Sequence, residues 1–448
     1  MIVRQFNRKF VLAVALVCML PTALLKAQDT LTVSLSKALE IAQSKSPTIR
    51  VANKEIERID YSKKERLSAL FPTISGSGTY SRTFAKSKSV ITMNGVPMIL
   101  EFGVDNSFSA GVSAALPIIA PTLWATLKMN EYDAQLALES AHSSQISLVN
   151  QIKKAYYGIL LSQDSYDVFQ RSYKNSFENA NVIRNKYKQG TVSEYEWIRA
   201  DVQVKNAESN ITSAESAVNM SKLQLKILMG LDMDVQIKVL GKLSDLETEK
   251  YSEIMKVDTG TIAKNSDLIQ FDIKSKQLDQ SLKIQQSAWL PTLGANINYS
   301  INSIGNDSQK MFNDYTNYPS SSAGLSLSIP IFQGGSKYFK YKQIKIQQDE
   351  LKIQRENLKR NVDLQVLNCI DNIKKSIKKI ESNKDGLKQA EKALSISQKM
   401  YDVGGATYLD LNNTELAYIN AGLSYNQSVF DYLSAKSDLE KLLGKDSK

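Results

Sequence analysis

The sequence predicts an internally duplicated chain of mixed α and β structure, with long antiparallel coiled-coil helices and four β-strands. Three observations predict this class. The chain matches itself along most of its length, two stretches of about 70 residues contain no proline and almost no glycine, and the segments before them alternate apolar and polar residues. The composition agrees, because only nine prolines occur in 448 residues, which leaves room for very long helices.

Residues 1–27 are typical of a secretory signal peptide. The first nine residues include three basic ones, an apolar stretch covers residues 10–25, and Ala27 provides a small residue for cleavage. A transmembrane anchor is the alternative, but it needs about 20 apolar residues. This run is shorter and is broken by Pro21, so we predict an exported chain.

Composition and charge exclude several functions. The formal net charge is +10, and the predicted signal peptide holds four of the basic residues and no acidic one. The remaining charge is too small and too dispersed to predict a nucleic-acid partner. Cys369 is the only cysteine outside the signal peptide, and His142 is the only histidine. We therefore predict no disulfide, no metal or other cofactor, and no catalytic constellation; the chain is not predicted to be an enzyme.

The duplication is visible in short matched segments. Residues 69–74 match residues 288–293 at an offset of 219, whereas residues 187–190 match residues 401–404 at an offset of 214. A loss of six residues falls between Pro72 and Pro117, because the Pro117 segment matches at an offset of 213. Insertions settle in exposed loops, so we expect a surface loop in this interval and in its partner.

Each copy is expected to repeat one order of elements. In the first repeat, a short helix precedes one that starts with Ser46 as its cap and Pro47 at its first position, and in the second repeat Asn265 and Ser266 occupy the matching place. Alternation of period two then predicts strands, and apolar residues at steps of three and four predict a long coiled-coil helix with a shorter return helix. The predicted ranges are 28–230 for the first repeat (strands about 72–84 and 106–117, long helix about 121–188, return helix about 193–229), 231–255 for a charged irregular connection, and 256–448 for the second repeat (strands about 291–303 and 322–332, long helix about 336–402, return helix about 407–443).

The four strands favour a membrane barrel. Each has one apolar face and one face of small polar residues, and about ten tilted residues suffice to cross a bilayer. In a soluble sandwich the apolar faces would instead meet inside. Open sheet edges are not tolerated in lipid, so a membrane location requires several chains, and three chains would supply twelve strands.

With these features in place, the chain resembles the TolC-type outer membrane efflux family. The resemblance rests on the two-fold repeat, the Ala-x-x-Pro-Thr boundary before each first strand, the Pro-Ile-Phe-Gln-Gly-Gly segment at 330–335, and the Tyr-x-x-Gly turns at 187–190 and 401–404. It covers essentially the whole exported chain. The resemblance implies a homotrimer with a shared twelve-stranded barrel among outer-membrane lipids and a periplasmic α-helical barrel, fed by an inner-membrane pump through a periplasmic adaptor (membrane fusion protein).

The turns between the paired helices are the predicted functional sites. Gly190 and Gly404 suit the left-handed position that ends a helix, and Ser193 and Thr407 can cap the next one. The resemblance implies that these four residues form tips that dock the adaptor. It also implies that Tyr401 and Asp410, with Glu196 as the equivalent of Asp410 in the first copy, lie at the periplasmic mouth or gate. A purely structural alternative is that Glu196 and Asp410 only complete the capping boxes of the return helices.

Two departures from the family pattern weaken the gate. Ala406 stands where the family has an arginine, and Asn413 stands where it has a second acidic residue, so a Tyr-Arg-Asp lock is not expected. The leading functional prediction is a passive exit duct of an efflux or secretion system, located in the outer membrane and extending into the periplasm. The alternative is an exported coiled-coil adaptor or scaffold without a barrel.

Overall fold

The computed structural model describes residues 30–93, 95–246, 262, 264–306 and 317–445. The predicted signal peptide at 1–27 lies outside the described residues. The chain divides into two compact units, which we call the tip unit and the sheet unit. The tip unit consists of Met1–Ser46, Ile152–Thr248 and Ser382–Phe430, and the sheet unit consists of Pro47–Gln151, Glu249–Glu381 and Asp431–Lys448.

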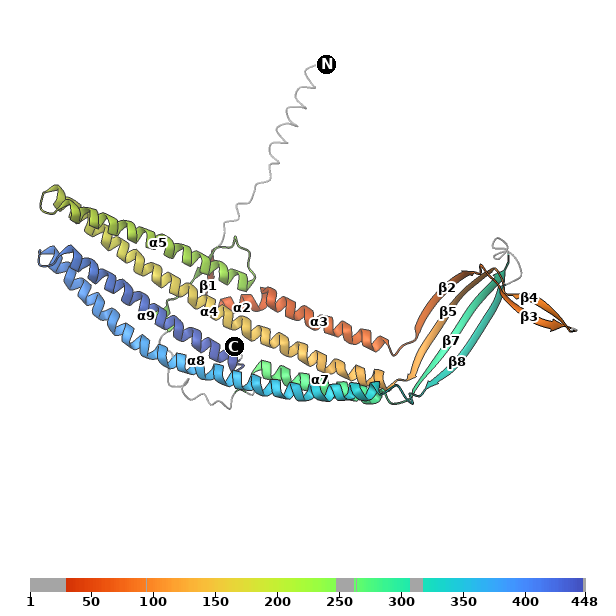
Figure 1. The fold of residues 1–448 in the computed structure, drawn as a ribbon. Coiled ribbons are helices and arrows are strands. Elements are labelled where there is room, and N and C mark those ends of the chain that lie inside the picture. Colours follow the sequence, from red (N-terminus) through yellow and green to blue (C-terminus); the bar gives the residue numbers. More distant parts are fainter. Residues whose placement is uncertain (1–29, 94, 247–261, 263, 307–316, 446–448) are drawn as a thin grey trace, which may run out of the picture. The chain divides into compact units, whose positions relative to one another are not determined.

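Long helices dominate the described chain (Figure 1). Helix α4 has 68 residues and α8 has 67, which corresponds to about 100 Å each at 1.5 Å per residue. Each is followed by a tight turn and a helix that runs back beside it. No helix in the described part of the chain combines the length and apolar character that crossing a membrane requires. The helices are α2 (Leu35–Lys45), α3 (Pro47–Ser68), α4 (Pro121–Lys188), α5 (Glu194–Met229), α7 (Ser266–Ser287), α8 (Ser336–Asp402) and α9 (Tyr408–Leu442).

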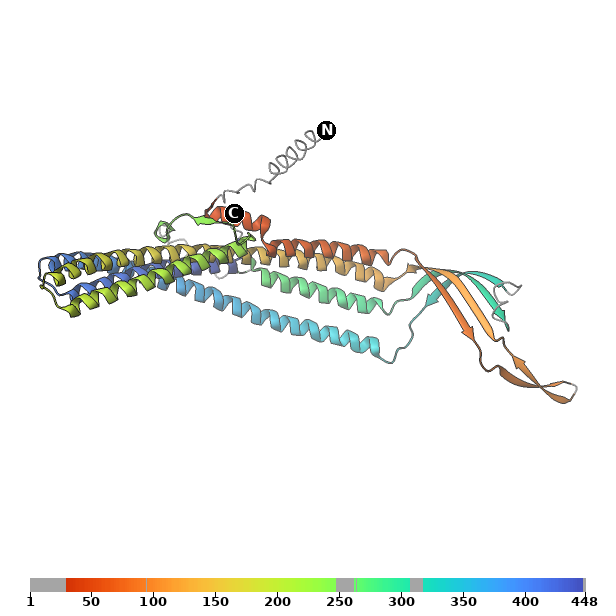
Figure 2. The same ribbon diagram turned by 90° about the horizontal axis from the view of Figure 1, so that it is seen from above.

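The sheet unit holds a four-stranded antiparallel sheet with the strand order β2-β5-β7-β8 (Figure 2). Its two central strands, β5 from the first repeat and β7 from the second, pair with each other. The two repeats are therefore joined inside this sheet. The outer strands β2 and β8 remain as edges. The strands are β2 (Thr73–Arg82), β5 (Asn106–Ile119), β7 (Thr292–Gly305) and β8 (Asn317–Ser328).

The register of this sheet separates its side chains into an apolar face and a polar face. Residues paired across strands point to the same side, and neighbouring rows alternate. An apolar row contains Ile74, Ala114, Ile297 and Ala323, and the adjacent polar row contains Ser75, Ser113, Asn298 and Ser322. Other rows repeat this division, so serine, threonine, asparagine and glycine fill one face almost alone.

Two hydrogen bonds between side chains of neighbouring strands lie on the polar face, and large apolar groups on the other face are exposed. Ser75 and Ser113 are 2.8 Å apart between hydroxyl oxygens, and the Ser109 hydroxyl donates to Asn302 Oδ1 at 2.7 Å. On the apolar face, Leu325 is 71% exposed within one chain. An exposed apolar face this wide must be covered by another apolar phase.

Strand β8 differs from its prediction in a way that proline explains. We expected this strand at about 322–332, but it spans Asn317–Ser328. Pro330 has no N–H for the ladder, which is consistent with the earlier end. Pro319 falls inside the strand opposite Ile301, which is tolerated because β8 is an edge strand.

Four short strands, which form two pairs, were not anticipated. The surface loop expected between Pro72 and Pro117 is a β-hairpin, because β3 (Ser87–Met93) pairs with β4 (Val96–Phe102). The connection at 231–255 was predicted to be irregular. Where it is described, it contains β6 (Ile237–Val239), which pairs in parallel with β1 (Leu31–Val33), and a 3-10 turn at Leu243–Leu246.

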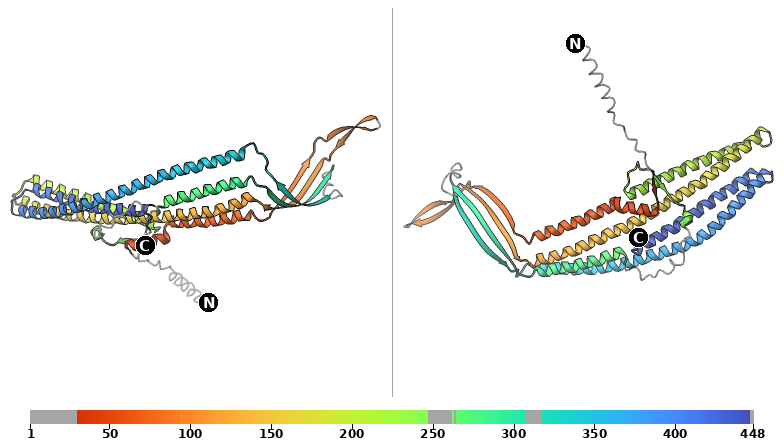
Figure 3. Two further views of the ribbon diagram at one scale, coloured as in Figure 1. Left: turned by 90° about the horizontal axis from the view of Figure 1, so that it is seen from below. Right: turned by 180° about the vertical axis from the view of Figure 1, so that it is seen from behind.

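In the tip unit, α4 lies beside α5 and α8 beside α9, and the two turns lie at the same end (Figure 3). The steps of three and four in the sequence predict a heptad seam along α4 that includes Ile152, Ile159 and Phe177. The prediction is correct at Ile152 and Ile159, which are 1% and 0% exposed. Nearer the turn the prediction is wrong. Phe177 is 49% exposed, whereas Ser176 is 1% exposed, because the buried row has moved by one position. A helix of 3.6 residues per turn drifts against a strict heptad, which accounts for this shift.

Candidate functional site

The turn between α4 and α5 has the geometry that a helix end with a left-handed glycine requires. Gly190 has a φ of 72°, a value that residues with a Cβ rarely adopt. Its N–H donates to the Tyr187 carbonyl at 2.9 Å, and the N–H of Thr191 donates to the Lys186 carbonyl at 2.9 Å. These two bonds define a Schellman motif, which satisfies carbonyls that the helix end leaves free.

The turn between α8 and α9 repeats this geometry. Gly404 has a φ of 77°. The Gly404 N–H donates to the Tyr401 carbonyl at 3.1 Å, and the Gly405 N–H donates to the Met400 carbonyl at 2.7 Å. The internal duplication therefore extends to individual hydrogen bonds at both tips.

The return helices begin at the predicted caps. The Glu196 N–H donates to Ser193 Oγ at 3.3 Å. At the other tip the box is reciprocal: the Asp410 N–H donates to Thr407 Oγ1 at 3.2 Å, and the Thr407 N–H donates to Asp410 Oδ2 at 3.0 Å. The Thr407 hydroxyl also donates to Asp410 Oδ2 at 2.6 Å. This bond, and next the bond from the Thr407 N–H, lower the pKa of Asp410, which is fully exposed, so its carboxylate is ionised at neutral pH.

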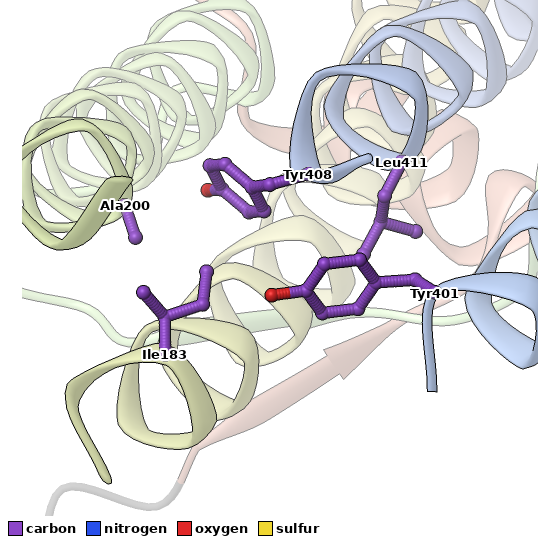
Figure 4. Packing of buried hydrophobic residues seen from close by; sticks show 5 residues of the cluster. All are labelled: Ile183, Ala200, Tyr401, Tyr408 and Leu411. Atoms are coloured by element: carbon purple, nitrogen blue, oxygen red, sulfur yellow. The ribbon is translucent and has the colours of Figure 1, made fainter. Parts of the chain in front are cut away.

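Tyr401 is part of a buried cluster behind the tips (Figure 4). Only 7% of it is exposed, and its ring centroid lies 6.2 Å from that of Tyr408. Burial, and next the Glu196 carboxylate, raise the pKa of the Tyr401 hydroxyl. Burial and the nearby Glu415 raise the pKa of Tyr408 to about 12. The cluster joins α4, α5, α8 and α9 through Ile183, Ala200, Tyr401, Tyr408 and Leu411.

The structure thus brings only some of the predicted site residues together. Tyr401 and Glu196 are close enough for their charges to interact, but Tyr401 packs in the interior of a single chain. Asp410 lies on the surface with its cap partner Thr407. A second aromatic contact, absent from the sequence prediction, stacks Tyr187 on Trp197 with centroids 5.4 Å apart and 7° between the rings.

A buried carboxyl group was missed by the sequence analysis. Glu415 on α9 is 3% exposed, and Ser172 Oγ on α4 donates to its Oε1 at 3.2 Å. Burial raises the pKa of Glu415 to about 7, and the hydroxyls of Ser172 and Ser176 lower it by less. The signal was available in α4, where small polar residues follow one another at steps of four and three (Ser172, Ser176, Asn179) in a helix otherwise lined by aliphatic residues.

The wall around Glu415 is a polar groove. It is lined by side chains from α4, α8 and α9, including Arg171, Lys174, Glu178, Glu391 and Tyr418. The Arg171 guanidinium donates to the Tyr418 hydroxyl at 3.3 Å, and this contact raises the pKa of Arg171. Within the described residues, no three or more histidine, cysteine, aspartate or glutamate side chains gather into a metal-binding group.

Comparison with known proteins gives a consistent match. The family model for "Outer membrane efflux protein" matches residues 38–231 and 261–445. "Outer membrane protein TolC" of Escherichia coli (strain K12) is 21% identical over 345 residues, which cover 76% of this chain and 70% of that protein. "Alkaline protease secretion protein AprF" of Pseudomonas aeruginosa is 21% identical over 431 residues, covering 94% and 86%.

A solved structure shares the fold. The Campylobacter jejuni CmeC outer membrane channel superposes with a TM-score of 0.71 at 16% identity, covering 92% of this chain and 85% of that one. The two segments matched by the family model correspond to the two repeats seen in the structure, each with its long helix and its return helix.

Proposed function

We propose that three copies of this chain, which belongs to the outer membrane efflux protein family, together form one duct. A periplasmic adaptor and an inner-membrane pump supply this duct with cargo. As a member of that family, the chain is an outer-membrane exit duct of an efflux or secretion system, and it extends into the periplasm. The family consists of transport channels, and we infer that this chain acts by passive conduction and not by catalysis.

The two-faced sheet is the observation that carries this proposal. Its apolar face suits lipid, its face of serine, threonine and asparagine suits a water-filled lumen, and strands of 10 to 14 residues are long enough to cross a bilayer. Its edges β2 and β8 cannot remain open in lipid. Pairing β8 of one copy with β2 of the next removes every edge, and three copies supply twelve strands.

The alternative of an exported scaffold without a barrel leaves the sheet unexplained. In a soluble scaffold the apolar face would be covered by the chain itself. Instead, Ile297 and Leu325 are 61% and 71% exposed. We therefore favour the duct.

The two tips are proposed to dock the adaptor. Both end in a left-handed glycine, and both present apolar side chains to water close to it: Val403 is 84% exposed and Tyr195 is 70% exposed. Exposed apolar groups on a tight, well-capped turn suit a rigid contact with another helical protein.

Native mass measurement of the detergent-extracted protein tests the assembly. We expect three chains, recovered with the outer membrane; a stable monomer, or recovery with soluble proteins, would overturn the duct. Docking is tested separately with a photo-cross-linking residue at Val403 and a control at Ile353, which is 69% exposed on α8. Adducts with a periplasmic protein at Val403 and none at Ile353 are expected. Equal labelling at both sites would refute tip docking.

A further inference from the structure

The β3–β4 hairpin is held firmly at its root and extends away from the main sheet. The N–H of Thr83 donates to the Asp105 carbonyl at 2.7 Å, and Lys86 Nζ lies 2.9 Å from Asp105 Oδ1. Asn306, at the end of β7, accepts from the Asp105 N–H at 3.1 Å. Helix α3 leads into β2 and β5 leads back into α4, so the hairpin leaves the sheet at the end opposite the helices (Figure 1). In an outer-membrane duct that end faces the outside of the cell.

The hairpin exposes apolar side chains on both of its faces. The register places Lys88, Val90, Thr92, Pro97, Ile99 and Glu101 on one side, which we call the first face. The second face holds Ser87, Ser89, Ile91, Met93, Val96, Met98, Leu100 and Phe102. Val90 and Ile99 on the first face are 63% and 64% exposed, and Val96 and Phe102 on the second are 64% and 53% exposed.

A hairpin of this kind needs a partner. An isolated two-stranded hairpin is marginally stable in water. Within the described chain, β3 and β4 pair only with each other, so neither face nor outer edge is covered by a neighbouring strand. The partner must therefore come from outside the single chain.

Lipid is a poor candidate for that partner. A surface-bound element would be apolar on one side and polar on the other, and an embedded one would expose its unpaired backbone edges to hydrocarbon. The hairpin also offers no net charge to an anionic membrane surface, because Lys88 and Glu101 form a pair with a 2.8 Å contact.

A second copy of the same chain fits better. The hairpin is continuous with β2, the edge strand through which one copy meets the next in a closed barrel. Three-fold assembly brings three hairpins to one rim, where their effective concentration is high. A ring with three-fold symmetry uses head-to-tail contacts, which need two different surfaces on each chain, and the hairpin has two different apolar faces.

We propose that the three β3–β4 hairpins of one trimer pack on one another head to tail, first face against second face, and form an apolar collar over the extracellular mouth of the duct. This inference rests on the trimer proposed above. The collar narrows the outer opening of the barrel.

Paired cysteines test the head-to-tail contact. In a Cys369→Ser background, Val90→Cys marks the first face and Met98→Cys marks the second. The two thiols of one hairpin lie on opposite faces and cannot form a disulfide with each other. After oxidation, or treatment with a short bismaleimide that tolerates a small offset, the double variant should give a covalent trimer on a denaturing gel. Each single variant should give none.

Two results would overturn the collar. The first is a double variant that gives no covalent trimer with either reagent while native mass still shows three chains, since this separates failure of the collar from failure of the trimer. The second is equal cross-linking by the single variants, which would indicate random collision. Replacing residues 87–102 with a short Gly-Ser turn gives an independent measurement: single-channel conductance should rise, and an unchanged conductance would also contradict the collar.

Discussion

Ser172 Oγ on α4 donates a 3.2 Å hydrogen bond to Oε1 of Glu415 on α9, and this contact fixes an ionisable group inside the tip unit. Burial raises the pKa of Glu415 from 4.5 to about 7. Between these two pH values the folded chain binds a proton that the unfolded chain has lost. The contribution of Glu415 to the free energy of unfolding is therefore fully present below about pH 4.5, falls as the pH rises towards 7, and no longer changes above about pH 7. We expect thermal unfolding of the helices at a lower temperature at pH 8 than at pH 5.

Glu415→Gln should remove that dependence, because a neutral amide replaces the carboxyl group at nearly equal volume. The variant should be more stable than the wild type at pH 8, by at most about 3 kcal/mol. Arg171, Lys174, Glu178 and Tyr418 share the groove, so Glu391→Gln, which removes an exposed carboxylate from it, serves as the control. A Glu415→Gln variant that keeps the wild-type difference between pH 5 and pH 8 would show that Glu415 does not carry the effect.

Asp410 separates a structural role from a role in conduction. We predict that three Asp410 carboxylates, one from each copy, form a ring at the periplasmic mouth that attracts cations. Asp410→Glu should then keep the cation preference of the channel, and Asp410→Asn should lose it in single-channel recordings. Thr407→Ala is the matched control, because it removes the cap, at a cost of about 1 kcal/mol, and leaves the charge in place. If the Asp410→Asn channel kept the wild-type cation selectivity, the only role of Asp410 would be to cap helix α9.

Because Ala406 and Asn413 replace polar family residues, we also expect the resting mouth to be held less firmly.

The fold class was predictable because its signals are local and occur twice. The Gly190 and Gly404 turns, their caps, and the period-two strands each depend on a few neighbouring residues, and the duplication gives an independent second reading of each. The hairpin at Ser87–Phe102 was missed because an offset between repeats shows that residues are inserted but not what they form. The β1–β6 pair joins residues about 200 positions apart, and three-residue strands carry too little pattern to be recognised.

The site was less predictable than the fold. The capping contacts of Thr407 and Asp410 were predicted because they span one helical turn. The burial of Tyr401 and Glu415 depends on how four helices meet, and a heptad read along one helix does not give that arrangement. The shift of the buried row from the predicted Phe177 to Ser176 has the same origin, because the neighbouring helices determine which positions of α4 are buried.

Strand β8 predicts which side of the sheet faces lipid. Leu327 lies on the apolar face opposite Leu293, and the adjacent Ser326 lies on the polar face opposite Gly294. Leu327→Lys should therefore destabilise the assembled barrel, by about 2 to 4 kcal/mol if the residue is near the midplane of the bilayer, whereas Ser326→Lys should have little effect. The fraction of trimer that survives heating in detergent measures the difference. Equal losses in the two variants would refute the assignment of the faces.

One glycine in the turn after α8 and one glycine inside α8 allow a final test of whether the tip turn is fixed by its backbone conformation. Gly404 has a φ of 77° and open space around its Cβ position, so Gly404→Ala meets no clash and its cost comes from the left-handed backbone alone, about 1 to 2 kcal/mol. Gly386 also has open space around its Cβ position, but it lies inside the helix. Gly386→Ala should therefore stabilise the protein by up to about 1 kcal/mol. The two substitutions add the same methyl group, one in the turn after α8 and one inside α8, so opposite shifts in the unfolding temperature are expected. Shifts of the same sign would mean that the local backbone conformation at Gly404 does not determine the stability of the tip.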